Sequence, residues 1–474
     1  MKYSIIKNFI YNAAYQVVLI IVPLLTTPYL SRVFGAEQLG IYSYNYAIAY
    51  YFSIFIILGL NNYGNRQIAI VKDEKKRLSE EFCSIYSMQI GCGFIVIVFY
   101  LLYILAFSKN KEISSIFLIY VVSEIFNINW LFYGLEEFRI TVCRSILIKV
   151  LSTAGIFIFV KDASDINIYC IVIAVSALLN QVMLWTYIPK YILFQIPSFY
   201  KIRKHIKPNL VLFLSVLGTS LYKYMDKIML GKMGTMAEVG YYEQSEKIVA
   251  LPVAFIVSLG TTMLPRISNI EAVSGKGDMR IASYFQKSIL FSMFLSASMS
   301  FGIMGVSKEF VPFFYGPGFD KIIILFSILL PSCIFLGIGN VITTQFLIPR
   351  GNDNIYIKSI FLGAIINILI NALLIPHYRS VGAAIGTLCA EITVCIYKIT
   401  YSNKKMKTMH TIKLGMPFCI MGIIMYIILN IIDMGFLSNI MAMLIKIIIG
   451  CAIFGILSIL YVIIIKSGRE RHAR

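Results

Sequence analysis

Charged residues are scarce in this sequence, and they never gather into a long polar segment. Only 14% of the 474 residues are charged, whereas 59% are hydrophobic and the mean hydropathy is +0.81. No polar segment is long enough to hold a soluble catalytic or nucleotide-binding domain. The phosphate-cradling pattern GxxxxGK[ST] is also missing. These absences exclude an ATP-driven pump on this chain and indicate a polytopic membrane protein.

Paired cysteines and clustered histidines are missing as well. The nine cysteines are scattered singly, most of them inside apolar runs, so the sequence predicts neither disulfides nor a metal site. The four histidines all fall in expected loops or in the C-terminal tail: His205, His377, His410 and His472. We therefore expect a protein without a metal ion or other cofactor.

Apolar runs of about 20 residues, the length that crosses a bilayer as a helix, recur along the whole chain. They predict an all-α polytopic membrane protein with about 14 transmembrane helices. The expected spans are 9–31, 38–60, 82–107, 113–134, 143–160, 167–189, 209–231, 239–264, 284–305, 322–345, 355–376, 381–400, 412–431 and 440–465.

The basic residues fall unevenly between these spans. If the N-terminus is cytoplasmic, thirty of the 42 Lys and Arg lie in cytoplasmic segments and eight lie in outer loops. The positive-inside rule then places both termini in the cytoplasm of a multi-pass protein of the cell membrane. This arrangement sets most of the net charge of +19 against the anionic inner leaflet, so we expect no nucleic-acid partner.

A weak internal repeat organises the spans into two halves. Gly40 and Gly240 begin the second and eighth spans, and Arg66 and Arg266 end them, so both pairs differ by 200 positions. Six spans per half preserve orientation and predict two six-helix lobes in parallel pseudo-repeat, followed by two terminal helices. The expected divisions are 1–189 for the N-terminal lobe, 190–208 for a basic linker, 209–400 for the C-terminal lobe and 401–474 for the terminal helices and tail.

The stretch 222–247 is unusually charged for its apolar surroundings. It carries Lys223, Asp226, Lys227, Glu243, Glu246 and Lys247. A charge at mid-bilayer costs about 2.5–3.5 kcal/mol, so these groups are expected to face a wet interior or the headgroup region. Lys223 and Lys227 are four residues apart and share one helix face. The cluster predicts either ion pairs that hold two helices together or a charged cavity for an anionic cargo.

Four stretches of the chain resemble a known family. They are PLLTTPYLSRVFGAEQLGIYSYNYAIAYYFSIFIILGLNNYGNRQIA (23–69), WLFYGLEEFR (130–139), MDKIMLGKMGTMAEVGYYEQSEKI (225–248) and SVGAAIGTLCAE (380–391). Together they resemble bacterial O-antigen and capsule repeat-unit flippases of the multidrug/oligosaccharidyl-lipid/polysaccharide exporter superfamily. The resemblance implies two six-helix bundles with alternating access, and a transporter rather than an enzyme. It also implies that undecaprenyl-pyrophosphate-linked oligosaccharide is moved from the inner to the outer leaflet.

The resemblance suggests roles for some residues, and the expected topology and side-chain chemistry suggest roles for others. Related flippases hold the pyrophosphate with cations in a central cavity, and the matching positions here are Arg32, Lys223, Lys227 and Lys247. Arg66 and Arg266 end their spans at the expected cytoplasmic mouth, where cargo would first be captured. The carboxylates proposed for ion coupling are Asp226, Glu243 and Glu246, for which a structural ion pair is the alternative. The expected partners are the lipid-linked glycan, membrane lipids, and a polysaccharide polymerase with its chain-length machinery.

Tyrosines cluster near the same charged segments. They are Tyr42, Tyr44, Tyr222, Tyr224, Tyr241 and Tyr242. Their rings are suited to sugar faces, and an interfacial aromatic belt explains them equally well.

Three other functions remain open from the sequence. A multidrug or cation antiporter of the same fold would need an acidic cavity, for which Glu124 and Glu391 are further candidates beside the carboxylates above. A flippase for the cell-wall lipid precursor would differ mainly in the sugars of its cargo. A membrane-embedded polymerase or ligase is disfavoured because the outer loops are short.

Overall fold

The described part of the chain is built from helices. The computed structural model describes residues 2–274, 279–434 and 437–472, and within these ranges every regular element is a helix. Helices suit these apolar runs because each backbone N–H and C=O then finds its partner inside its own segment when lipid replaces water. The all-α fold class expected from the sequence is confirmed.

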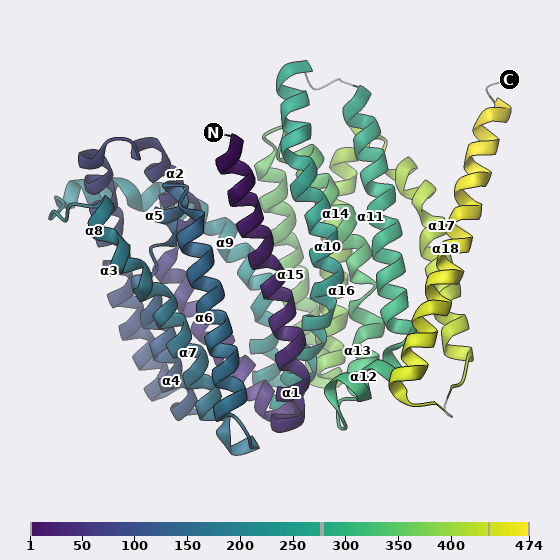
Figure 1. Ribbon diagram of the computed structural model, residues 1–474, viewed down its shortest axis with the longest axis horizontal. Helices are drawn as coiled ribbons and strands as arrows, with labels where there is room; N and C mark the ends of the chain where they lie inside the picture. Colours follow the sequence, from purple (N-terminus) through teal and green to yellow (C-terminus); the bar gives the residue numbers. More distant parts are fainter. Residues whose placement is uncertain (1, 275–278, 435–436, 473–474) are drawn as a thin grey trace. The chain divides into compact units, whose positions relative to one another are not determined.

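The chain forms two compact units, Met1–Ile228 and Met229–Arg474 (Figure 1). Unit 1, drawn from purple to blue-green, contains α1 (Lys2–Ile57), α2 (Leu60–Val71), α3 (Lys75–Ala106), α4 (Lys111–Ser123), η1 (Glu124–Phe126), α5 (Asn129–Gly134), α6 (Phe138–Phe159), η2 (Ala163–Asp165), α7 (Ile166–Val182), η3 (Met183–Tyr187), α8 (Ile188–Tyr191) and most of α9 (Phe199–Met233). Inside it, α1 packs against α3, α4 and α6, α4 packs against α7, and α2 packs against α5. The division between the units falls within α9, and the four-part division expected from the sequence stays a prediction.

The first long element, α1, is two helices in one. They join at Gly35, whose backbone is not helical (φ 65°, ψ −179°). A positive φ combined with an extended ψ is favourable only for glycine, so this residue permits the chain to turn between two apolar segments. A further break separates α9, which ends at Met233, from α10, which begins at Met236, with Gly234 between them.

A second glycine lets α2 and α5 pack closely in unit 1. A Cβ atom on Gly64 would lie 2.8 Å from Cε3 of Trp130, too close for any side chain. Trp130 is fully buried and stacks on Phe82 with ring centroids 5.5 Å apart. This aromatic core fixes α5 and the irregular segment that precedes it.

Unit 2 holds the remaining helices, drawn from green to yellow in Figure 1. They are α10 (Met236–Ser274), α11 (Met279–Gly305), α12 (Ser307–Tyr315), α13 (Lys321–Leu329), α14 (Ser332–Ile342), the π-helix η4 (Thr343–Leu347), α15 (Asp353–Tyr378), α16 (Ser380–Met406), α17 (Thr408–Ile431) and α18 (Asn439–His472). Within this unit α15 packs along α16, α11 packs along α17, and α17 contacts α18. The tenth expected span, 322–345, is interrupted, because α13 gives way to α14 at Pro331.

Twelve helices of the described residues are long and apolar enough to cross a membrane. The first of them, Tyr15–Val71, includes the break at Gly35, and α9, with its charged residues, is not among the twelve. The chain is therefore a multi-pass membrane protein, and the exact count of fourteen spans stays a prediction.

Candidate functional site

A column of tyrosine rings runs along the second helix of α1 in unit 1. Tyr42, Tyr46 and Tyr50 recur every four residues and therefore lie on one face of the helix. The Tyr46 ring centroid lies 5.2 Å from that of Tyr120 on α4 and 6.4 Å from that of Tyr224 on α9. The rings of Tyr50 and Tyr224 are closer, at 4.1 Å. Three helices thus contribute to one set of aromatic faces that also carry hydroxyl groups. The sequence predicted Tyr42 and Tyr224 as members but missed the other three.

Two lysines of α9 approach the Tyr224 ring. The ammonium nitrogen of Lys223 lies 5.5 Å from the ring centroid and that of Lys227 lies 5.1 Å from it. Lys223 is exposed, whereas Lys227 is only 6% exposed. A cation over an aromatic face gains about 0.5–2 kcal/mol, which orients the ammonium groups without neutralising their charge. The structure brings the two lysines to one ring, as their spacing predicts.

Asp226, next to Lys227 in sequence, is more deeply buried still, at 1% exposure. It lies within electrostatic reach of Tyr51, whose hydroxyl donates a hydrogen bond of 2.9 Å to the carbonyl of Ser220. Unit 1 therefore buries a carboxylate and an ammonium at consecutive positions of one helix. Because burying either charge alone is costly, this part of α9 is a functional candidate by default.

Arg32, another predicted site residue of unit 1, lies on the first helix of α1. It is exposed, three residues before the turn at Gly35, and its guanidinium donates to the carbonyl of Pro28 at 2.8 Å. That bond holds the charged group along its own helix.

Three predicted residues belong to α10 in unit 2. Glu243, Glu246 and Lys247 are all half-buried, and Lys247 donates to the side-chain oxygen of Gln244 at 3.3 Å. The assignment of Lys247 to one cavity with Arg32, Lys223 and Lys227 stays a prediction, because these residues are divided between the two units.

The two arginines predicted at the cytoplasmic mouth are both exposed. Arg66 lies on α2. Arg266 lies on α10 beside Pro265, donates to the hydroxyl of Tyr284 at 2.5 Å, and has its guanidinium carbon 4.4 Å from the centre of that ring. Arg266 is thus already oriented by α11, and its role in capture stays a prediction.

The sequence missed a break in the fourth span, directly beside the tyrosine column. The helix stops between α4 and α5, and Glu124 at the break lies within electrostatic reach of Tyr50 and Tyr120. The Glu124 carboxylate accepts a hydrogen bond of 2.7 Å from the side-chain amide of Asn127. The signal that predicts such a break is Glu124 followed by Asn127 and Asn129 in an otherwise apolar run.

Side chains from neighbouring helices satisfy the unwound backbone. The amide of Gln89 on α3 donates to the carbonyls of Glu124, Ile125 and Asn127 at 2.9, 3.1 and 2.9 Å, and its oxygen accepts from the indole of Trp130 at 3.1 Å. Irregular backbone at membrane depth persists only where such partners exist. The break is therefore stabilised by specific side-chain hydrogen bonds, which hold Glu124 beside the tyrosine column.

Arg144 on α6 stabilises the residues that follow the same break. It is 5% exposed, and it donates to the side-chain oxygen of Asn129 at 2.9 Å and to the carbonyl of Asn180. Arg144 is one of the thirty basic residues that the topology expected from the sequence places in cytoplasmic segments. In the structure its guanidinium instead donates hydrogen bonds inside unit 1 and orients polar groups around α5.

Replacing Gln89 with leucine is expected to destabilise the protein by about 1–3 kcal/mol, because three carbonyls of the break lose their side-chain donor. Thermal unfolding of the purified protein in detergent measures the change. The matched control is Gln195→Leu at an exposed position, for which we expect a change within about 0.5 kcal/mol. Equal melting temperatures for the two variants would show that Gln89 does not support the break.

Unit 2 contains buried ion pairs of its own. Arg350, in the turn after η4, and Glu271, near the end of α10, are 2.7 Å apart, and each side chain is 5% exposed. Burial lowers the pKa of the Arg350 guanidinium from its ordinary value, and the Glu271 carboxylate opposes that shift. The guanidinium also lies 4.3 Å from the ring centre of Phe346 in the π-helix. A second pair, Lys321 with Glu238 at 2.6 Å, is buried on one side only, because the Lys321 side chain is 29% exposed; it joins α13 to the start of α10.

Comparisons with known proteins agree with this fold. The chain matches the family model "Polysaccharide biosynthesis protein" over residues 5–271 and the model "Lipid II flippase MurJ" over residues 227–451. It is 25% identical to a "Putative O-antigen transporter" of Escherichia coli K12, over 83% of this chain and 95% of that protein. It is 26% identical to a "Probable low-salt glycan biosynthesis flippase Agl15" of Haloferax volcanii, over 40% of each chain.

Solved structures show the same architecture. A structure titled "Lipid II flippase MurJ, inward closed conformation" covers 97% of this chain and 100% of its own, with a TM-score of 0.72 and 18% identity. An inward-facing multidrug resistance MATE family transporter of the MOP superfamily covers 83% of this chain and 96% of its own, with a TM-score of 0.60 and 14% identity. At these identities the likeness establishes the fold.

Proposed function

Because this chain belongs to the polysaccharide biosynthesis protein family and is a membrane transporter rather than an enzyme, we propose that it flips undecaprenyl-pyrophosphate-linked oligosaccharide repeat units. The cargo passes from the inner to the outer leaflet of the cytoplasmic membrane, where it feeds the assembly of O-antigen, capsule or a teichuronic-type polymer. The observation that carries this proposal is the buried Lys227 beside Lys223, both held against the Tyr224 ring.

In this proposal the two lysines bind the pyrophosphate of the cargo. A pyrophosphate needs at least two cations in a shielded place, and charge-assisted hydrogen bonds to phosphate oxygens are the strong ones. Lys227 supplies the shielded cation and Lys223 the exposed one, both over the Tyr224 ring. Arg32 and Lys247 complete the anion site in this proposal.

The tyrosine column serves the sugars. Tyr42, Tyr46 and Tyr50 present aromatic faces with hydroxyl groups along one side of α1, and sugars pack their apolar C–H faces on such rings while hydroxyls bond at the edges. This arrangement accepts an oligosaccharide without dictating one sugar sequence.

The remaining predicted residues serve entry and energy coupling. Arg66 and Arg266 attract the anionic cargo at the cytoplasmic mouth. Asp226, with Glu243 and Glu246 on α10, binds or releases a coupling cation as the transporter alternates between its two states. Both termini lie in the cytoplasm, and the exported repeat unit passes to a polymerase and its chain-length machinery.

A strain that lacks this gene tests the proposal. We expect surface polysaccharide to disappear and the lipid-linked repeat unit to accumulate in the inner leaflet, with both effects reversed by the wild-type gene. Wall-synthesis arrest would instead indicate a flippase for the cell-wall precursor.

A cation antiporter is the second candidate, because Glu124 and Asp226 place two carboxylates in unit 1 beside the aromatic rings. Aromatic rings and acids together suit an organic cation. In the same strain this function predicts normal surface polysaccharide and a loss of ethidium export.

A further inference from the structure

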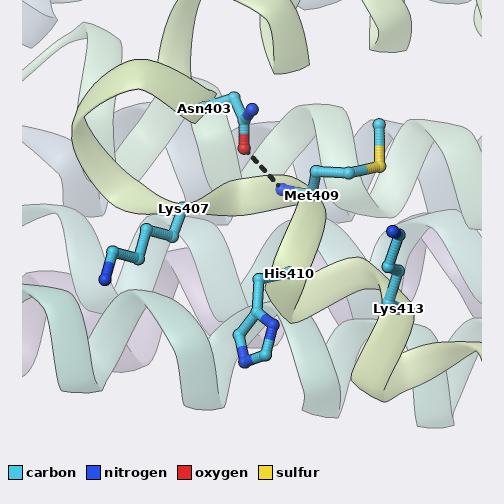
Figure 2. A pocket seen from close by; sticks show the side chains of 5 residues that line it. All are labelled: Asn403, Lys407, Met409, His410 and Lys413. Atoms are coloured by element: carbon cyan, nitrogen blue, oxygen red, sulfur yellow. Dashed lines mark hydrogen bonds between the residues drawn. The ribbon is translucent and has the colours of Figure 1, made fainter.

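The turn between α16 and α17 in unit 2 forms an open, basic cavity of about 470 Å³ at the surface, and its lining residues are all exposed. Its lining residues are Asn403, Lys407, Met409, His410 and Lys413 (Figure 2). None of the five is acidic. The surrounding sequence carries charge of one sign only, since positions 392–432 hold five lysines and neither Asp nor Glu. The cavity therefore presents positive charge that its own segment does not neutralise.

Several hydrogen bonds fix the backbone of the turn that forms this cavity. Lys407 adopts the left-handed conformation (φ 48°, ψ 41°), and its backbone N–H donates to the carbonyl of Asn403 at 3.1 Å. The side-chain oxygen of Asn403 accepts from the backbone N–H of Met409 at 2.9 Å (Figure 2), and the buried hydroxyls of Ser402 and Thr408 are 2.8 Å apart. The side chains of Lys407 and Lys413 thus project from a fixed backbone.

An apolar stripe continues from the cavity along α17. Lys413 occupies the same helix face as Met409, Met416 and Ile420, which recur at three- and four-residue intervals. Met416 and Ile420 are 49% and 54% exposed, as expected for residues that face lipid chains. At 1.5 Å per residue, Lys413 lies about 8 Å beyond the start of the helix, a depth from which a long lysine side chain reaches back to the headgroup level.

We propose that this cavity binds the headgroup of an anionic glycerophospholipid of the inner leaflet, with the acyl chains lying along the stripe of α17. The loop belongs to the basic side of the chain, which the sequence predicts to be cytoplasmic, and basic pockets on that side of membrane proteins fit lipid phosphate groups. Lys407 and Lys413 contact the phosphate, and His410 and Asn403 supply further polar groups at the rim. The site is separate from the cargo site proposed in unit 1, and its occupant is a membrane lipid, not the transported glycan.

Native mass spectrometry of the full-length protein in detergent tests this proposal, with dioleoyl phosphatidylglycerol as the probe and dioleoyl phosphatidylcholine as the neutral reference. We expect the wild type to prefer phosphatidylglycerol. The double variant Lys407→Gln/Lys413→Gln is expected to lose roughly 25-fold in affinity for it, about fivefold per lysine. The single variant Lys413→Gln should lose about fivefold, and it keeps the test valid if the double variant folds poorly.

The matched control is Lys404→Gln/Lys405→Gln, which removes the same charge from the last turn of α16, outside the cavity. It should retain the wild-type preference. If the control loses as much affinity as the cavity variant, the effect is diffuse surface attraction and the proposal is wrong.

Two further probes identify the source of the phosphate. Inorganic phosphate should compete weakly, because it lacks the acyl chains; effective competition by it would indicate a site for small anions. Undecaprenyl phosphate should bind no better than phosphatidylglycerol. A clear preference for it would assign the cavity to the cargo carrier and overturn the proposal.

Discussion

Replacing Lys227 with glutamine is expected to abolish export while the protein still folds and inserts. The substitution removes the shielded cation at the Tyr224 ring, and losing one charged contact to a pyrophosphate costs about 1.5–3 kcal/mol, or roughly 10- to 100-fold in affinity. Surface polysaccharide, normalised to the amount of protein in the membrane, measures the effect. Lys232→Gln is the matched control: it is an exposed lysine on the same helix and should export normally.

The double variant Lys227→Gln/Asp226→Asn separates the anion site from a structural ion pair. On the anion-site account, the second substitution does not restore export, because the missing cation is still missing. If the double variant exports like the wild type, Lys227 serves to neutralise Asp226 and the account of the cargo site is wrong.

Replacing Glu271 with glutamine is expected to destabilise the protein by about 3–5 kcal/mol. The change removes the negative charge 2.7 Å from the guanidinium of Arg350, which is 5% exposed, and breaking a buried pair on one side costs this much. The melting temperature in detergent should fall by several degrees. The double variant Glu271→Gln/Arg350→Met should recover much of the loss, because it also removes the uncompensated charge.

The exposed pair Lys72–Glu136, at 2.9 Å, supplies the comparison. Its side chains are 31% and 62% exposed, so Glu136→Gln should change the stability by no more than about 1 kcal/mol. If Glu271→Gln is equally mild, the Arg350–Glu271 pair does not stabilise unit 2.

The helices of this fold follow directly from the sequence, because backbone hydrogen bonding in lipid leaves an apolar run of 20 residues few alternatives. Breaks within these helices are partly predictable as well, because proline and glycine disturb helical backbone hydrogen bonding. Pro331 interrupts its span, and Gly35 supplies the turn at the end of the first one. Pro23 and Pro28 also lie within the first span, yet α1 continues through both.

The polar interior could not be predicted in the same way, because it depends on residues far apart in the chain. Gln89 meets the break at 124–127 only after α3 and α4 have packed together. The sequence places Lys398 among the cytoplasmic basic residues, whereas it is 6% exposed with its ammonium 5.4 Å from the ring centre of Tyr356. Charge and hydropathy indicate which segments enter the membrane, but not which charged side chains the helices then enclose.

The candidate site was likewise predictable only in part from the sequence. Four-residue spacing correctly brought Lys223 and Lys227 to one face, and α9 supplies the ring that both approach. The contribution of Tyr46, Tyr50 and Tyr120 required the packing of α1, α4 and α9. Spacing within one helix was therefore informative, whereas partners on other helices were found only in the structure.

Lipid flipping by the purified protein in vesicles is the most direct measurement. Vesicles would carry a labelled undecaprenyl-pyrophosphate-linked oligosaccharide, and enzymatic cleavage of the sugar from outside would report its transfer between leaflets. The account predicts rapid transfer with the wild type and with Lys232→Gln, and transfer near the protein-free rate with Lys227→Gln. Transfer by the wild type no faster than in empty vesicles, or undiminished transfer by Lys227→Gln, would contradict it.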